Sequence, residues 1–431
     1  MSAPLKILML CWEYPPLITG GLGNASGGLA NALVKQGHEV EVLLPKVEPE
    51  HDTGDQPKIS DLSQLILDEK VWVENKEVVE KVKDLQFGVN LLPYLPPQYF
   101  TTEREREVVY TETKVSKEVS TVEKIELEGG YGEQLMGEIQ KYALLACQKV
   151  QEGNYDIVHA NDWMTFRAGS LIQKLTKAPV VFHVHSVESD RNGLGANPEI
   201  AQIEKEALIH AQYIVSVSKR LQKQIARDYG VNERKIEVVP NGVSGRWKST
   251  KVLGKTPVVG FIGRLTHQKG PSYFLDVARE LRSKVPGIKF MVIGDGYLKE
   301  EMKAKAQRLN LPIVFTNFLE GKELTQARNQ LDLLIVPSLS EPFGLVILEG
   351  MQAGIPTITT KNTGIAESIP ELPQLEPWDT FQLTRLSERL LSQASERKQL
   401  MDACQKAGKK LTWKVSAKKV TFLYEGILQH M

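Results

Sequence analysis

The chain has 431 residues, of which 42% are hydrophobic and 25% are charged. This composition is typical of a globular protein, and the length favours two or three domains. Basic and acidic residues each total 53, so the formal net charge is zero and a chain-wide bias toward nucleic acid or anionic membrane is excluded. The three cysteines, Cys11, Cys147 and Cys404, are odd in number and far apart. They predict neither a disulfide framework nor a CxxC metal site, and they favour a reducing compartment.

The amino-terminal segment is interpreted as a buried strand rather than an export signal. Residues 7–11 are apolar but too few for the hydrophobic region of a signal peptide. No apolar run approaches the length of a membrane span. We therefore expect a cytoplasmic protein with no transmembrane segment and no nucleic-acid partner.

The first half of the chain alternates strands and helices, which is typical of βαβ units with parallel strands. The pattern loosens over 47–127, where 101–128 favours a solvated β-hairpin or a partly mobile insertion. The elements expected are strands at 6–11, 40–44, 156–160, 180–185, 213–217 and 235–239, a glycine-rich loop at 20–23, and helices at 29–36, 133–152 and 198–211.

The second half repeats the alternation after a polar stretch. Its strands are almost continuously apolar, which is typical of a parallel sheet covered on both faces. The sequence thus predicts two doubly wound parallel-sheet α/β domains, residues 1–245 and 257–411, joined by a linker at 246–256. Ligands of such sheets bind at the carboxyl ends of the strands, so a cleft between the domains is the expected site.

The first candidate motif is the glycine pair Gly20 and Gly21, between a strand and a helix. Glycines let the backbone approach an anion, and a helix N-terminus favours negative charge. The spacing matches neither the dinucleotide fingerprint nor the Walker loop. A tight turn that only allows close packing is the alternative.

The second motif is a pair of cations, Arg264 and Lys269, around the first strand-to-helix turn of the second half. Arginine offers a planar fork of donors and lysine a point charge, and two cations at one such turn can clamp a diphosphate. The alternative is a pair of solvated surface cations. The place at the carboxyl end of a strand favours the diphosphate interpretation.

The third motif contains two glutamates. Glu341 lies in a loop after a strand, Gly344 sets up a turn, and the following helix carries Leu345 and Glu349 on one face. Two carboxylates suit a ligand with hydroxyls at both ends, and the free amides of the helix start would face a phosphate between them. Stabilisation of the helix dipole would explain Glu341 but not Glu349, a residue type that is almost never fully buried without a partner.

Together these motifs resemble those of retaining GT-B glycosyltransferases of the family 4 group. The glutamate pair is similar to that group's paired-glutamate motif, and the cation pair is similar to its donor-phosphate motif. Further resemblance, to the glycogen and starch synthase-like members, lies in His159-Ala160-Asn161-Asp162-Trp163, Phe182-His183-Val184-His185-Ser186 and Pro240-Asn241-Gly242-Val243. The resemblance spans nearly the whole chain and implies a GT-B fold in which 412–431 crosses back to the first domain.

The resemblance also implies residue roles. On the donor side, the cations Arg264 and Lys269 would bind the diphosphate, together with the backbone amides of Gly20, Gly21, Gly344 and Leu345. Glu341 would bind hydroxyls of the transferred sugar, and Glu349 would bind those of the ribose. His185 would lie beside that sugar, with Asp162 and Asn241 lining the sugar and acceptor side. The catalytic set is then His185, Glu341, Arg264, Lys269 and Asp162, with the leaving phosphate taking the acceptor proton and no metal or other cofactor required.

Several histidines and one asparagine have simpler interpretations. We expect His183 to face away from His185 along their strand and to serve the structure. His159 and Trp163 are expected to pack rather than to react. Asn241 could be only a turn residue, because Asn-Gly pairs favour turns.

The implied activity is transfer of a hexose, glucose first, from a nucleotide-diphospho-sugar to a carbohydrate acceptor such as an α-glucan. Ile18 stands where bacterial starch synthases usually carry lysine, so a uridine diphosphate donor fits at least as well as ADP-glucose. The alternatives are a family 4 transferase for a lipid-linked or surface-polysaccharide acceptor, a sugar-nucleotide epimerase, and a carbohydrate-binding protein with a degenerate site.

Overall fold

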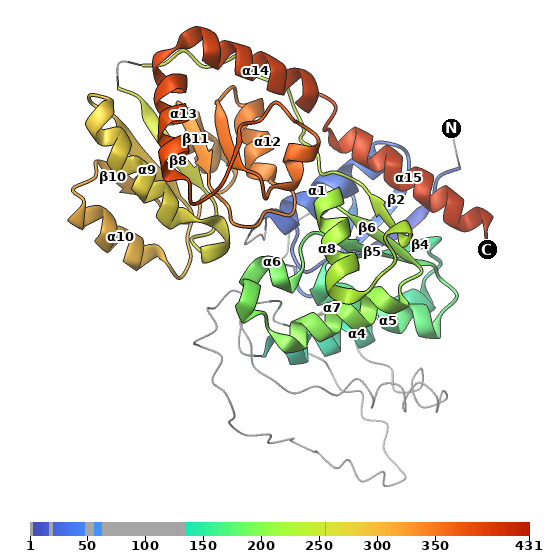
Figure 1. Cartoon of the computed structure of the whole chain (residues 1–431). Coiled ribbons are helices and arrows are strands. Elements are labelled where there is room, and N and C mark those ends of the chain that lie inside the picture. Colours follow the sequence, from blue (N-terminus) through green and yellow to red (C-terminus); the bar gives the residue numbers. More distant parts are fainter. Residues whose placement is uncertain are drawn as a thin grey trace, which may run out of the picture.

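The computed structural model describes residues 3–16, 20–47, 56–62, 127, 129, 134–254 and 256–431. The hairpin or insertion expected over 101–128 therefore lies outside the described residues, apart from Leu127. Figure 1 shows two α/β domains side by side, with the last helix of the chain lying along the first of them. The three cysteines are buried and free.

The first domain is built on a parallel sheet. Among the described residues it has seven strands in the order β3-β2-β1-β4-β5-β6-β7. Strand β1 pairs with β2 on one side and β4 on the other, and all three strands are largely buried. The strands are β1 (Lys6–Leu10), β2 (Glu39–Leu44), β3 (Lys58–Asp61), β4 (Ile157–Asn161), β5 (Val180–Val184), β6 (Tyr213–Ser216) and β7 (Ile236–Val238).

Helices cover both faces of this sheet. Helix α4 covers one face with the apolar side chains that were predicted to share one side of this helix, from Leu135 to Ala146, and these are buried. Three of the helices, α5, α6 and α8, were not predicted, although Ser218 caps the start of α8 and Gly230 ends it. The helices are α1 (Gly21–Val34), α4 (Leu135–Glu152), α5 (Trp163–Leu175), α6 (Glu188–Asn192), α7 (Pro198–His210) and α8 (Lys219–Tyr229).

Helix α1 corrects the expected loop at 20–23 and helix at 29–36. It begins at Gly21, with Gly20 as its N-cap, and ends at Val34. Its glycines serve packing as well as the turn, because a Cβ on Gly28 would lie 2.2 Å from Cε2 of Trp413. Glycine is therefore used inside this helix because Trp413 approaches its backbone too closely for a side chain at Gly28.

The second domain repeats the plan. Within the described residues its parallel sheet has six strands in the order β10-β9-β8-β11-β12-β13, and a separate apolar core lies between this sheet and α9, α10 and α13. The elements are β8 (Val258–Ile262), α9 (Pro271–Lys284), β9 (Lys289–Ile293), α10 (Lys299–Arg308), β10 (Ile313–Phe315), α11 (Gly321–Gln330), β11 (Leu333–Val336), α12 (Leu345–Gln352), β12 (Thr357–Thr360), β13 (Gln374–Leu375), α13 (Thr380–Ser392) and α14 (Ala394–Gly408).

The last helix, α15 (Trp413–Gln429), crosses back to the first domain (Figure 1). Its buried face, which includes Val420 and Tyr424, joins α1 and the first sheet in one apolar cluster. This confirms the predicted class, two Rossmann-like parallel-sheet domains with a returning C-terminal helix. The boundaries at 245 and 257 stay predictions, while the first sheet ends at Val238 and the second begins at Val258. Among the described helices, none is both long and apolar enough to cross a membrane.

Candidate functional site

A cleft of about 1050 Å³ lies between the two domains. Its walls come from the carboxyl ends of strands in both sheets, which is where such folds bind ligands. The structure brings every residue predicted for the site to this one cleft. They are Gly20, Gly21, Asp162, His185, Asn241, Arg264, Lys269, Glu341, Gly344, Leu345 and Glu349.

Lys269 and Glu341 meet on the second-domain wall. The Nζ atom of Lys269 lies 2.6 Å from Oε2 of Glu341, and both side chains are mostly buried. Lys269 sits in the turn between β8 and α9, where Gly270 has φ +65° and a Cβ would lie 2.1 Å from a backbone oxygen. Glycine thus permits the turn that aims the lysine into the cleft. Arg264, from the same turn, donates to Gln268 at 3.4 Å.

Glu349 also has a cationic partner. Nη1 of Arg328, from α11, lies 2.9 Å from Oε2 of Glu349, on the first turns of α12. Burial raises the pKa of Glu349, and the nearby guanidinium lowers it. Gly344, the N-cap of α12, has φ +106° and turns the chain into that helix. The carboxylate, in the second turn of α12, is thus held by Arg328 at the wall of the cleft.

The first-domain wall is organised around Asp162. This residue follows β4 with φ +62°, and its Oδ1 accepts from the amides of His185 (3.3 Å) and Ser186 (3.4 Å). Burial raises the pKa of Asp162 to about 6, and Arg191, 4.0 Å away, opposes this shift. Asp162 therefore fixes the loop after β5 on which His185 stands.

His185 is an uncharged hydrogen-bonding group. Burial lowers its pKa to about 3, so the imidazole is neutral near pH 7. Its Nε2 lies 3.3 Å from Oδ1 of Asn161, whose amide nitrogen donates to the carbonyl of Leu10. Within the described part of the chain, Nδ1 of His185 is buried with no partner. The neutral ring can serve a sugar hydroxyl but cannot supply a proton as an acid at neutral pH.

The expected orientation of His183 was wrong. Its ring stacks on that of His185 with centroids 4.2 Å apart. Residues two apart along a strand point to the same face, so the two histidines share one side of the sheet. His183 also lies 3.0 Å from His159, which in turn lies 2.6 Å from the hydroxyl of Tyr424 on α15. A buried chain of rings therefore leads from the returning helix to the cleft.

Behind Asp162 lies a buried ion network centred on Arg191. Its Nε donates to Glu188 at 2.9 Å, its Nη2 to Glu204 at 2.5 Å and its Nη1 to Ser186 at 2.7 Å. Burial raises the pKa of Glu204 to about 7, against the lowering effect of Arg191. These contacts hold the first-domain wall of the cleft in one arrangement.

The loop that carries Glu341 is tied to the other domain. The hydroxyl of Ser218 donates to the carbonyl of Pro342 at 2.7 Å, and Arg220 donates to the hydroxyl of Ser340 at 2.8 Å. Both donors belong to the first domain. The position of Glu341 thus depends on the contact between the domains as well as on its own sheet.

Two family models match the chain in succession. One, described as the starch synthase catalytic domain, matches residues 6–235, which is more than half of the chain. The chain belongs to the starch synthase catalytic domain family. The other model, described as glycosyl transferases group 1, matches residues 246–410. The protein is therefore a glycosyltransferase with the GT-B fold, as the motifs implied.

Comparison with known proteins of similar sequence or structure supports this family assignment. The chain is 25% identical to an uncharacterised glycosyltransferase, MJ1607, of Methanocaldococcus jannaschii over 99% of its own length and 100% of the relative's. It is 24% identical to a glycogen synthase of Mycobacterium tuberculosis over 85% of this chain and 80% of that protein. The structure of a sucrose-phosphate synthase from Thermosynechococcus elongatus has a TM-score of 0.72 at 17% identity, with 99% of both chains covered, and shows the shared fold.

Several residues near this glycosyltransferase cleft were missed. Among them, Glu13, Arg328 and Trp413 line it, and Tyr424 reaches it through the histidines. Glu13 lies three residues after the end of the first strand, a position that could have indicated a ligand contact. Arg328 lies on α11, where only Ala327 is buried, so its sequence pattern is that of a solvated helix.

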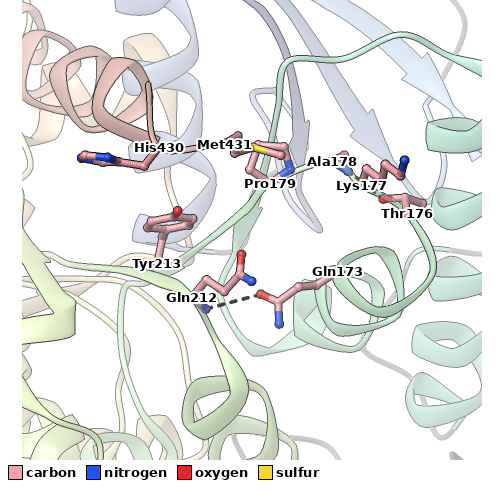
Figure 2. Close-up of a pocket in the computed structure, with 9 residues that line it drawn as sticks. All are labelled: Gln173, Thr176, Lys177, Ala178, Pro179, Gln212, Tyr213, His430 and Met431. Atoms are coloured by element: carbon pink, nitrogen blue, oxygen red, sulfur yellow. Dashed lines mark hydrogen bonds between the residues drawn. The ribbon is translucent and has the colours of Figure 1, made fainter. Parts of the chain in front are cut away.

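A second hollow, of about 630 Å³, lies in the first domain (Figure 2). It opens where β5 and β6 begin, and Figure 2 shows Gln173, Tyr213 and His430 around it. The backbone amide of Gln212 donates to Gln173 at 3.4 Å. None of the predicted site residues lines this hollow, which lies at the end of the strands opposite to the cleft.

Among the described residues, no group of three His, Cys, Asp or Glu side chains could hold a metal ion. The expectation that no metal is needed stays a prediction.

Proposed function

We propose that this glycosyltransferase moves a hexose, glucose first, from a nucleotide-diphospho-sugar to a carbohydrate acceptor, with an α-glucan as the leading acceptor and with retention of the anomeric configuration. The observation that carries the proposal is the convergence of two cations and two carboxylates from the second domain on one neutral histidine from the first, across a single cleft. This is the arrangement that the family 4 resemblance implies.

In this proposal the second domain binds the donor. Arg264 and Lys269 take the diphosphate, assisted by the backbone amides at Gly344 and Leu345, and those of Gly20 and Gly21 approach from the other side. Lys269 already contacts Glu341 at 2.6 Å, so the bound donor would lie against both. Cations arranged in advance around a leaving phosphate stabilise the charge that develops there.

The chemistry follows from the leaving group. The bond from the anomeric carbon to the phosphate oxygen breaks as the bond to the acceptor hydroxyl forms on the same face, and the leaving phosphate takes the acceptor proton. Glu341 and His185 hold hydroxyls of the transferred sugar, and Asp162 and Asn241 line the acceptor side. A neutral His185 suits this role because no proton has to come from it.

A donor and acceptor panel tests the proposal. UDP-glucose, ADP-glucose, GDP-mannose and UDP-N-acetylglucosamine are each incubated with glycogen or maltooligosaccharides, and release of the nucleoside diphosphate is measured with and without EDTA. We expect glucan-dependent release from one glucose donor, resistant to EDTA. The variant Lys269→Gln should lower this rate by about 100-fold or more. Lys361→Gln, at an exposed lysine, is the matched control.

The outcomes separate the parts of the proposal. Release that does not depend on glucan keeps the transferase and rejects the glucan acceptor, which directs the search to lipid-linked and surface-polysaccharide sugars. Conversion of the donor without any acceptor indicates an epimerase. No release and no binding of any donor rejects the donor assignment.

A further inference from the structure

Arg328 is a mostly buried cation that none of the sequence motifs includes. It stands near the end of α11 and faces Glu349 on α12 across the second-domain wall of the cleft. One guanidinium nitrogen lies 2.9 Å from Oε2 of Glu349, and only 16% of the arginine side chain is exposed. Of the described residues, none partners its buried Nε. A guanidinium that close to a ligand cleft, with one of its five donors committed to a carboxylate, points to a role in the site.

The electrostatic setting explains why Glu349 needs such a partner. Burial raises the pKa of Glu349, because a low-dielectric environment disfavours the ionised form. The opposing cause is Arg328, through its charge and its hydrogen bond. A protonated carboxyl would turn one of its two acceptor oxygens into a donor. Without the arginine, the site would therefore lose acceptor capacity where a ligand with adjacent hydroxyls has to be bound.

The geometry leaves room for such a ligand. Arg328 contacts Oε2 of Glu349, and an ionised carboxylate has about four lone-pair positions. The remaining positions can accept from two hydroxyl groups. Because the arginine comes from a different helix, it also fixes the orientation of the carboxylate relative to the cleft, which α12 alone would not fix.

We propose that Arg328 is a positioning residue of the nucleoside subsite, holding Glu349 ionised and oriented to accept hydrogen bonds from the two adjacent ribose hydroxyls of a nucleoside diphosphate. The inference rests on the proposed function, in which Glu349 contacts the ribose. It adds a second residue to that subsite and predicts a requirement for an unmodified ribose.

Calorimetric titration of the full chain with UDP, ADP and 2′-deoxy-UDP tests the inference. The variants are Arg328→Gln, Arg328→Lys, Glu349→Gln and the double variant Arg328→Gln/Glu349→Gln. Arg279→Gln is the control, since that arginine is exposed and pairs with its neighbour Glu280. We expect Arg328→Gln to weaken binding of the better of the two ribonucleotides by about tenfold. It should have little further effect in the Glu349→Gln background, and a smaller effect on 2′-deoxy-UDP, which keeps only one of the two hydroxyls.

The pH profile distinguishes positioning from a structural effect. The terminal phosphate of the nucleotide takes up a proton near pH 6, so each variant is compared with the wild type at the same pH. In Arg328→Gln the affinity relative to the wild type should fall as the pH is lowered from 8 to 6, since Glu349 has lost the guanidinium that lowers its pKa. Arg328→Lys keeps the positive charge and should keep this ratio nearly constant even if it recovers only part of the affinity.

Each contrary result has a separate meaning. If Arg328→Gln binds the ribonucleotide as the wild type does while Glu349→Gln is weakened, the inference is overturned and the ribose contact stands. If both variants bind as the wild type does, the ribose contact itself is rejected and the inference fails with it. Equal and additive losses for UDP and 2′-deoxy-UDP would show that the arginine contacts base or phosphate directly. A thermal denaturation curve for each variant verifies that it is folded.

Discussion

Replacing Tyr424 by phenylalanine removes one hydroxyl group from the middle of the first domain. That hydroxyl lies 2.6 Å from Nδ1 of His159, and both residues are fully buried. The ring would stay in place, because Tyr424 packs edge-on against His159 with centroids 5.9 Å apart and belongs to the core between α1 and α15. The substitution therefore tests the hydrogen bond and leaves the packing unchanged.

The size of the effect follows from the neighbours. Nε2 of His159 is already 3.0 Å from Nδ1 of His183, so neither tautomer of His159 satisfies both of its nitrogens once the hydroxyl is gone. A buried polar atom left without a partner costs about 1–3 kcal/mol. For a domain of 150–250 residues this corresponds to a fall in melting temperature of roughly 2–12 °C.

The assay is urea denaturation of the full chain followed by tryptophan fluorescence, together with a thermal scan. Tyr213→Phe is the matched control, because that tyrosine belongs to the same domain but is partly exposed. We expect Tyr424→Phe to lower the free energy of unfolding by the stated amount and the control to stay within about 0.5 kcal/mol of the wild type. A Tyr424→Phe variant as stable as the control would refute the reasoning and show that the chain of rings contributes no hydrogen-bond energy.

Three further outcomes are expected. In Gly270→Ala, at φ +65°, the new Cβ would lie 2.1 Å from a carbonyl oxygen and should displace the turn that carries Lys269. The rate of nucleoside diphosphate release should therefore fall even where thermal scans show that the variant is folded. Gly28→Ala would place a Cβ 2.2 Å from Trp413 and should destabilise the protein by about 1–3 kcal/mol in thermal scans. Burial lowers the pKa of His159 and His185 to about 3. The unfolded chain therefore binds protons at these histidines first, so the free energy of unfolding should be unaffected above about pH 6.5 and should fall as the pH is lowered toward 3. Imidazole NMR signals of these two residues should not titrate between pH 8 and 5, and a transition near 6.5 would contradict their burial.

Local patterns in the sequence were sufficient to place the ligand cleft. Strand ends followed by glycines or charged residues predicted its lining, because the carboxyl ends of parallel strands meet at one edge of a sheet. This rule placed Lys269 and Glu341, 72 positions apart, at the same edge of the second sheet, and the family resemblance assigned both to the donor; they lie within hydrogen-bonding distance.

Partners on other elements could not be predicted in this way. Arg328 pairs with Glu349 from a helix whose sequence looks solvated, and Tyr424 meets His159 across 265 positions. Such pairs depend on how helices pack, and no local spacing encodes them. The misplacement of His183 was a different error, because the two-residue period of a strand was sufficient to put it beside His185.

The return of α15 also has a consequence for how the chain folds during its synthesis. Trp413, Ala417, Val420 and Tyr424 fill the core against α1, yet the ribosome makes them only after the whole of the second sheet. At the usual 5–20 residues per second, the first sheet and α1 wait roughly ten seconds or more for this covering helix. Through that interval an apolar face stays open on the nascent chain, so the amino-terminal half is a candidate substrate for a chaperone until α15 arrives.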